Sequence, residues 1–61
     1  MNLPTNVLGK ITVEKLVKCK VETYGYIRKI TDTHLEFEEQ EGDKFRFTIK
    51  YVKDFEIINN K

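Results

Sequence analysis

The stretch HLEFEEQEGDKFRFTIKY, residues 34–51, decides the fold class of this chain. Apolar residues recur at every second position on both sides of a polar turn, Glu41-Gly42-Asp43, and such alternation is typical of strands with one buried and one solvated face. Two strands joined by a short turn that contains glycine predict a β-hairpin. The apolar residues expected on its buried face are Leu35, Phe37, Phe45, Phe47, Ile49 and Tyr51.

The second face of this hairpin is charged. Its first strand carries Glu36 and Glu38 there. Its second strand carries Lys44 and Arg46, so opposite charges are expected to face one another, at roughly 0.2–1 kcal/mol for each cross-strand pair. The acidic residues of the segment therefore indicate a solvated, salt-paired face rather than a metal site. They are Glu36, Glu38, Glu39, Glu41 and Asp43.

A further strand is predicted upstream of the hairpin, over residues 17–22. Its apolar members, Val17, Cys19 and Val21, alternate with charged residues. The Cys19 thiol is accordingly expected on the buried face, where an unreactive structural cysteine is the commoner role. A single cysteine excludes an internal disulfide, and one cysteine with one histidine cannot complete a four-ligand zinc site.

Residues 24–30 predict the next strand, and this strand must bend. Ile27 and Ile30 are three positions apart and cannot both face inward on a regular strand. A bend or bulge is therefore expected, and Gly25 is well placed to permit it. The small polar residues 31–33 predict the turn into the hairpin.

The N-terminal segment, residues 1–15, has an ambiguous pattern. Helical spacing of apolar residues after Pro4 predicts a short helix or turn. Ile11 and Val13 alone would equally suit a strand, because periodicity does not separate the two in short segments.

A last strand is predicted over residues 55–58, after a compact turn at 51–54, and residues 59–61 are expected to form a frayed tail. Together these elements predict one domain, residues 1–61. The expected fold is mostly β, a small five-stranded antiparallel open barrel with a short N-terminal helix or turn. The strand edges of such a barrel need covering, and pairing with another copy of the chain is one way to cover them.

Size and composition exclude several classes of function. The chain has 61 residues and a formal net charge of +1, so its total charge does not indicate a partner. With one histidine, one cysteine and a small volume, the chain offers few side chains for catalysis and little room to enclose a substrate. We therefore expect a non-enzymatic protein without a cofactor. No apolar run approaches the ~20 residues of a membrane span. A cytoplasmic protein that self-associates is the expectation, because cores this small rarely suffice alone.

The pattern resembles the Sm-like family, including its bacterial RNA-chaperone branch, whose members have SH3-like barrels. The resemblance covers roughly residues 6 to 58. It rests on four segments: Asn6-Val7-Leu8, Gly25-Tyr26-Ile27-Arg28-Lys29-Ile30, His34-Leu35-Glu36-Phe37 and Ile49-Lys50-Tyr51-Val52. It implies rings in which the fourth strand of one subunit pairs with the fifth of the next, and binding of single-stranded RNA through the loops after strands two and four.

The loop motifs of this chain differ from those of the family. Asp32-Thr33-His34 stands where the family usually has an aspartate and, four residues later, an asparagine that contacts a base, and His34 lies near the asparagine position. Lys50-Tyr51 stands where the family usually has arginine-glycine, and is closer to the lysine-histidine of the bacterial branch.

Basic and aromatic residues supply the candidate binding site. The lysines and the arginine between residues 18 and 29 are expected on neighbouring strands, where they would form a patch for phosphates, with tyrosines between them as stacking platforms. The predicted nucleic-acid-binding residues are Lys18, Lys20, Tyr26, Arg28, Lys29, His34, Lys50 and Tyr51. The alternative is a protein-interaction or regulatory module that recruits a partner through an exposed strand edge or a tyrosine patch.

Overall fold

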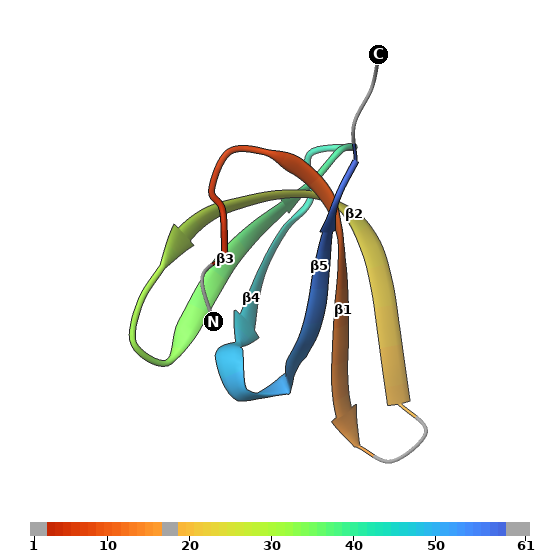
Figure 1. Cartoon of the computed structure of the whole chain (residues 1–61), viewed down its shortest axis with the longest axis vertical. Helices are drawn as coiled ribbons and strands as arrows, with labels where there is room; N and C mark the ends of the chain where they lie inside the picture. The colour runs from red at the N-terminus through yellow and green to blue at the C-terminus, as the bar shows by residue number, and fades with distance from the viewer. Residues whose placement is uncertain (1–2, 17–18, 59–61) are drawn as a thin grey trace.

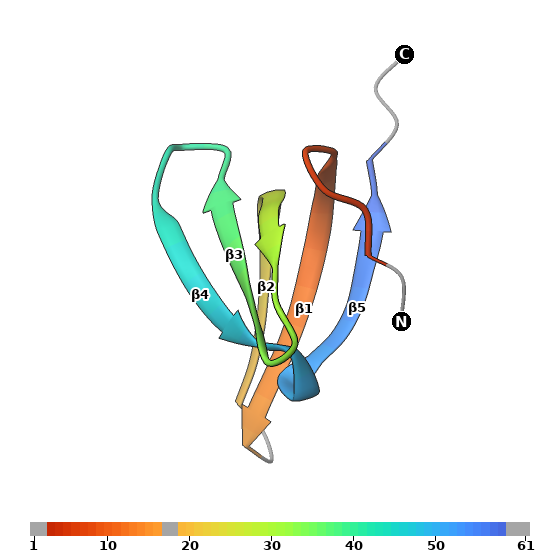
Figure 2. The ribbon, with the colours of Figure 1, turned by 90° about the vertical axis from the view of Figure 1, so that its left-hand side faces the viewer.

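The computed structural model describes residues 3–16 and 19–58. Its strands are β1 (Leu8–Leu16), β2 (Cys19–Ile30), β3 (His34–Glu39), β4 (Lys44–Thr48) and β5 (Val52–Ile57), with one 3-10 turn, η1 (Ile49–Tyr51), before β5. All neighbouring strands are antiparallel, and they form one curled sheet in the order β4-β3-β2-β1-β5 (Figure 1). The prediction of a mostly β, five-stranded antiparallel open sheet is confirmed. Figure 2 shows β4 and β5 as the two outer strands of the sheet.

The predicted hairpin is β3 and β4, in the expected register. Leu35 pairs with Phe47, and the facing charges lie as predicted, Glu36 opposite Arg46 and Glu38 opposite Lys44. Gly42 in the connecting turn has a φ of 102°, a conformation that glycine adopts without steric cost.

The end of this hairpin differs from the prediction. β4 stops at Thr48, and Ile49 and Tyr51 belong to η1, where both are half-buried against the core. Phe45 remains 42% exposed, because β4 is an edge strand and none of the described strands lies on its far side. The predicted turn at 51–54 is also wrong: η1 makes the turn, and β5 already begins at Val52.

The two strands predicted over 17–22 and 24–30 are parts of a single long strand, β2, of which residues 17–18 lie outside the described part. The expected irregularity is present as a register shift between Ile27 and Lys29 in the pairing with β3. It leaves Ile27 fully buried and Ile30 39% exposed.

Gly25 has a different role from the one predicted. A Cβ at this position would collide with the backbone of Glu38 and would lie 2.7 Å from the Cα of Glu39. The glycine therefore permits the close approach of β2 to β3, while the bulge itself is located at Arg28.

The predicted N-terminal helix or turn over residues 1–15 is wrong for most of its length. Leu8–Leu16 is β1, which lies between β2 and β5 inside the sheet. Ile11 and Val13 are buried, so their alternation was the informative pattern. Pairing on both sides of β1 outweighs the weak helical spacing, as tertiary context commonly does for short segments. The expected tail at 59–61 lies outside the described residues.

The core lies on the inner face of the curled sheet and draws on every strand. Each fully buried large apolar side chain contributes roughly 1.5–3 kcal/mol. The core residues are Ile11, Val13, Ile27, Leu35, Phe37, Phe47 and Val52. The predicted burial of Cys19 is wrong: the thiol is exposed, because the first part of β2 extends past the end of β3 and has only β1 beside it.

Candidate functional site

Two turns that are distant in sequence meet at one end of the sheet. The backbone N–H of Ile49 donates a hydrogen bond of 2.9 Å to the carbonyl of Thr33, and His34 pairs with Thr48. Figure 2 shows the turn between β2 and β3 beside η1, above the lower end of β1. We call this region the turn end and define it as Thr31–His34 and Ile49–Tyr51.

Hydrogen bonds hold the first of these turns in place. The Thr31 N–H donates to the His34 carbonyl at 2.8 Å, and the His34 N–H donates to the Thr31 hydroxyl at 3.1 Å. The His34 ring is half-buried, with Nδ1 2.7 Å from the Thr33 hydroxyl. The imidazole is therefore partly oriented and still accessible to a ligand.

The second turn presents a cation beside an aromatic ring. The Lys50 Nζ lies 5.2 Å from the centroid of the Tyr51 ring, within the range of a cation–π contact. Lys50 is exposed, whereas Tyr51 is half-buried and packed against the core. The Tyr51 side chain thus packs against the core and remains partly accessible to a ligand.

Tyr26 and Arg28 form a separate unit on β2. The guanidinium carbon of Arg28 lies 4.4 Å from the centroid of the Tyr26 ring. Its Nε donates to Glu38 at 3.0 Å, and its NH1 group donates to the side-chain carbonyl of Asn6 at 2.9 Å. Arg28 thus covers one face of the tyrosine and already has a carboxylate partner, which reduces what both residues offer to RNA.

The predicted basic patch on neighbouring strands is not assembled. Lys20, Arg28 and Lys29 all lie on β2. At about 3.3 Å per residue, Lys20 is roughly 30 Å from Lys29 along the strand. Lys20 instead lies 3.6 Å from the carboxylate of Glu22, while Lys29 is exposed close to the turn end. Lys18 lies outside the described residues.

A groove that the sequence did not predict lies over β2, β3 and β4. It has a volume of about 460 Å³. Its lining residues are Arg28, Glu36, Phe37, Glu38, Lys44, Phe45 and Arg46. The alternating charges of the hairpin were the available signal, but the hollow between them depends on the curl of the sheet. Carboxylates and cations alternate in it, so it offers no uniformly charged surface.

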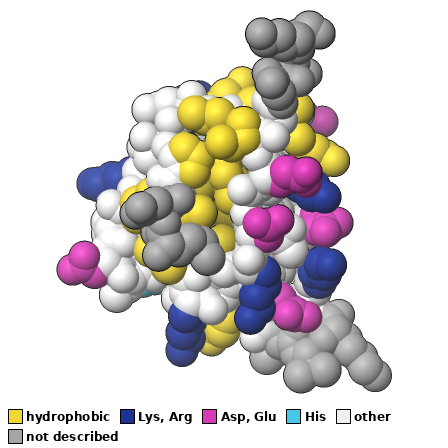
Figure 3. All heavy atoms as spheres, in the orientation of Figure 1, with side chains coloured by type: hydrophobic (Ala, Val, Ile, Leu, Met, Phe, Trp, Pro, Cys, Tyr) yellow, Lys and Arg dark blue, Asp and Glu magenta, His cyan; other side chains and the backbone are white. Residues whose placement is uncertain are grey.

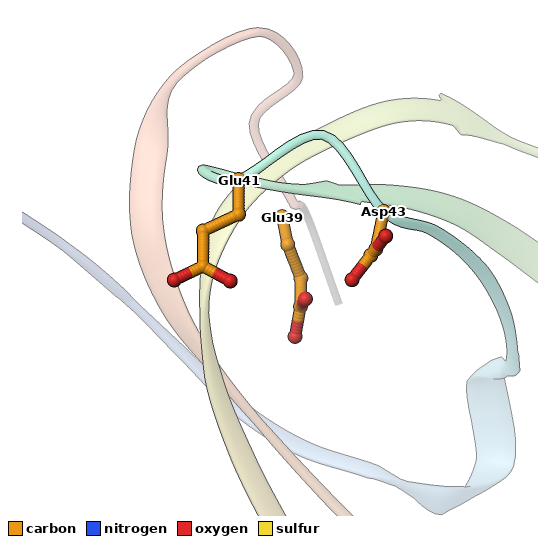
Figure 4. A group of neighbouring side chains, drawn as sticks. All are labelled: Glu39, Glu41 and Asp43. Carbon is orange, nitrogen blue, oxygen red and sulfur yellow. The ribbon is translucent and has the colours of Figure 1, made fainter.

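Three carboxylates gather at the turn between β3 and β4 (Figure 4). The ligand atoms of Glu39, Glu41 and Asp43 lie within 4.8 Å of one another. Oxygen ligands of this kind suit hard cations. Glu39, however, accepts a hydrogen bond of 2.5 Å from the Thr23 hydroxyl, and Glu41 and Asp43 are exposed. A solvated acidic turn accounts for the group, and we assign no metal to it.

No protein-family model, curated protein or solved structure matches this chain. Over residues 3–16 and 19–58, no helix has the length and apolar character that crossing a membrane requires. Figure 3 shows apolar side chains gathered over the upper middle of the face that it displays, and basic and acidic side chains mixed with one another at its right, with no extended region of one charge on this face.

Proposed function

We propose that this protein is a non-enzymatic binding module for single-stranded RNA and that the RNA contacts the turn end. The observation that carries the proposal is the hydrogen bond between Ile49 and Thr33. It joins the turns after β2 and β4, which are the two loops that the resemblance to Sm-like proteins implies for RNA binding. His34 follows Thr33 in the first of these turns, and Lys50 and Tyr51 follow Ile49 in the second.

Each side chain of the turn end has a role in this proposal. Lys50, with the nearby Lys29, contacts phosphates. Tyr51 and His34 stack on unpaired bases, and stacking of this kind contributes about 1–3 kcal/mol per base. Arg28 and Tyr26 contribute less, because they already contact each other and Glu38. Lys20, which is remote from the turn end, contacts only a longer RNA, together with Lys18, two positions before it in the sequence.

Titration of a fluorescent, mixed-sequence single-stranded RNA, followed by anisotropy at several salt concentrations, tests the proposal. We expect binding whose affinity falls with salt by a slope of ~0.7 for each phosphate contacted. Lys50→Gln lowers the affinity and the slope, whereas Lys44→Gln, the same change on an exposed lysine at the other end of the hairpin, leaves both unchanged. Equal effects of the two substitutions would reject the turn end, and absence of binding at 50 mM salt would reject the function.

Changing Lys18 and Lys20 together to Glu tests whether these two lysines contribute to RNA binding. A long RNA should then bind more weakly while a short one binds as before. An unchanged affinity for both RNAs would remove these lysines from the binding surface.

A second candidate function is pairing through the outer edges of the sheet. Phe45 on β4 is 42% exposed and Ile57 on β5 is 55% exposed, and both strands lie at the outside of the sheet that the described residues form. The resemblance implies pairing of these edges between copies, and the same edges suit strand addition by a different protein. Sedimentation velocity tests self-association: Ile57→Lys should reduce it, and a concentration-independent monomer of the unaltered chain excludes an assembled ring.

A further inference from the structure

The first part of β2 is a third open edge of the sheet. β1 pairs with β2 from Cys19 onward, but the pairing of β2 with β3 begins only at Gly25. The Tyr24 carbonyl accepts a hydrogen bond of 3.2 Å from the backbone N–H of Gln40, so the part of β2 that bonds to β3 and its following turn ends at Tyr24. Among the described residues, no strand pairs with the other side of residues 19–23. Figure 1 shows this part of β2 extending with β1 away from the body of the sheet.

This edge lacks two of the usual features that prevent strand pairing, a proline and a bulge in the strand itself, and its two charged residues, Lys20 and Glu22, are of opposite sign. Natural edges are commonly protected by proline, a bulge or very short length. Residues 19–23 contain no proline, and the register shift of β2 occurs later, after Ile27. Val21 is 49% exposed at the middle of the edge, and Cys19 is exposed as well. A segment that alternates apolar and polar side chains, and whose second side pairs with no described strand, is thus open to solvent.

The backbone groups of this edge point outward at alternate residues. The Tyr24 carbonyl is directed toward the β3 side, where it meets Gln40. Because alternate residues of a strand direct their N–H and C=O groups to the same side, those of Glu22 and Lys20 face the open edge. A strand added here would form its hydrogen-bonded pairs at Lys20 and Glu22 and leave Val21 at a non-hydrogen-bonded position.

We propose that two copies of this chain pair antiparallel along this edge, with the two-fold axis at Val21. In this register Val21 meets Val21 of the second copy, Lys20 lies opposite Glu22, and Glu22 lies opposite Lys20. Both hydrogen-bonded pairs then join opposite charges, which is the favourable cross-strand arrangement. An isologous interface of this kind closes on itself as a dimer.

The charges also disfavour the neighbouring registers. An axis at Lys20 would place two lysines opposite each other, and an axis at Glu22 would place two glutamates opposite each other. Parallel pairing in register would place Lys20 opposite Lys20 and also Glu22 opposite Glu22. Like charges directly opposite destabilise strand pairs, so the sequence selects the axis at Val21. The dimer uses neither the turn end nor the edges of β4 and β5, so it is independent of ring assembly and of the RNA contacts proposed for the turn end, and it shares only Lys20 with the contacts proposed for a longer RNA.

Disulfide trapping tests the axis directly, with purified protein and no RNA. Non-hydrogen-bonded antiparallel residues have Cα atoms about 4.5 Å apart, within the range that a disulfide spans. Val21→Cys in a Cys19→Ser background should therefore form a covalent dimer under mild oxidation. The unaltered chain, with its native Cys19, is the matched control: this thiol is exposed on the same strand but lies opposite Thr23, roughly 13 Å along the strand from its counterpart. We expect the protein with Val21→Cys to cross-link at least tenfold faster than the control. Equal rates for the two proteins would overturn the proposal.

Charge reversal tests the register. In the Cys19→Ser, Val21→Cys background, Lys20→Glu alone and Glu22→Lys alone should each slow cross-linking severalfold, because like charges then face each other. Mixing the two proteins should restore it as a mixed disulfide, since every facing pair is again of opposite sign. A mass difference between the two chains identifies the mixed dimer. A statistical mixture of disulfides, with no preference for the mixed species, would contradict this register.

Discussion

The aromatic ring of Phe55 lies against the backbone of Gly9, in the space that a side chain at position 9 would need. An ideal Cβ at Gly9 would lie 2.7 Å from Cε2 of that ring and 2.8 Å from the carbonyl oxygen of Glu56. β1 and β5 pair at this point, with Gly9 opposite Ile57. The contact lets the Phe55 ring of β5 cover the start of β1, where the first and the last strand of the chain pair.

Gly9→Ala is therefore expected to destabilise the domain by about 1–3 kcal/mol, the usual cost of overpacking. Urea denaturation measures the change. Phe55→Ala opens the space, so the second Gly9→Ala change should cost far less in that background, and the difference is the coupling between the two residues. Additive effects would show that the glycine is required by the Glu56 carbonyl rather than by the ring.

Ile27 and Ile30 provide a matched pair for the bulge in β2. Both lie on one strand, but Ile27 is fully buried and Ile30 is 39% exposed. Ile27→Val should cost about 0.5–1.5 kcal/mol through loss of a buried methylene. Ile30→Val should change the free energy of unfolding by less than about 0.5 kcal/mol. Thermal denaturation of both variants is the measurement, and a larger loss at Ile30 would place the bulge elsewhere.

Substitution of Gly42 separates the cost of backbone strain from the cost of steric overlap. Its φ is 102°, and a Cβ added there would meet no atom within 4 Å. Gly42→Ala should therefore destabilise through backbone conformation alone, by roughly 1–2 kcal/mol, and Gly42→Asn by less because asparagine tolerates positive φ better. Urea midpoints of the two variants give the comparison. Equal stability of alanine and glycine at this position would mean that the turn has relaxed to another form.

Arg28 and Glu38 are predicted to be weakly coupled despite their good geometry. Their 3.0 Å ion pair is partly exposed on both sides. A double-mutant cycle with Arg28→Met and Glu38→Gln should give a coupling of about 0.2–1 kcal/mol that decreases in 0.5 M salt. Arg28→Met alone should cost more than the coupling, because it also removes the hydrogen bond to Asn6. A coupling that salt leaves unchanged would indicate a pair screened from solvent.

The hairpin of β3 and β4 could be predicted from sequence because its information is local. Alternation, a glycine turn and facing charges all lie within residues 34–48, and they agree with one another. β1 could not be assigned in the same way. Its two buried residues, Ile11 and Val13, are compatible with either period, and their burial depends on pairing with both β2 and β5.

The candidate site was predictable only in part. Lys50, Tyr51 and His34 were singled out by residue type, but the meeting of the two turns that carry them depends on the tertiary hydrogen bond from Ile49 to Thr33. The pattern around Cys19 indicated a strand correctly. The same pattern did not predict that Cys19 is exposed. Alternation shows which residues share a face of a strand, but it does not show whether another strand extends far enough to cover that face.

The pairing of β1 with β5 sets an order for assembly during synthesis. Neighbouring strands of the sheet are consecutive in the chain except at this one place, where residues 9–13 meet residues 52–57. The hairpins can form as they leave the ribosome, but the inner strand β1 keeps an unsatisfied edge until residue 57 has emerged. Contacts between such distant segments are the slow part of folding. A chain shortened to end before Val52 should accordingly remain sensitive to protease, whereas the chain of 61 residues should be protected.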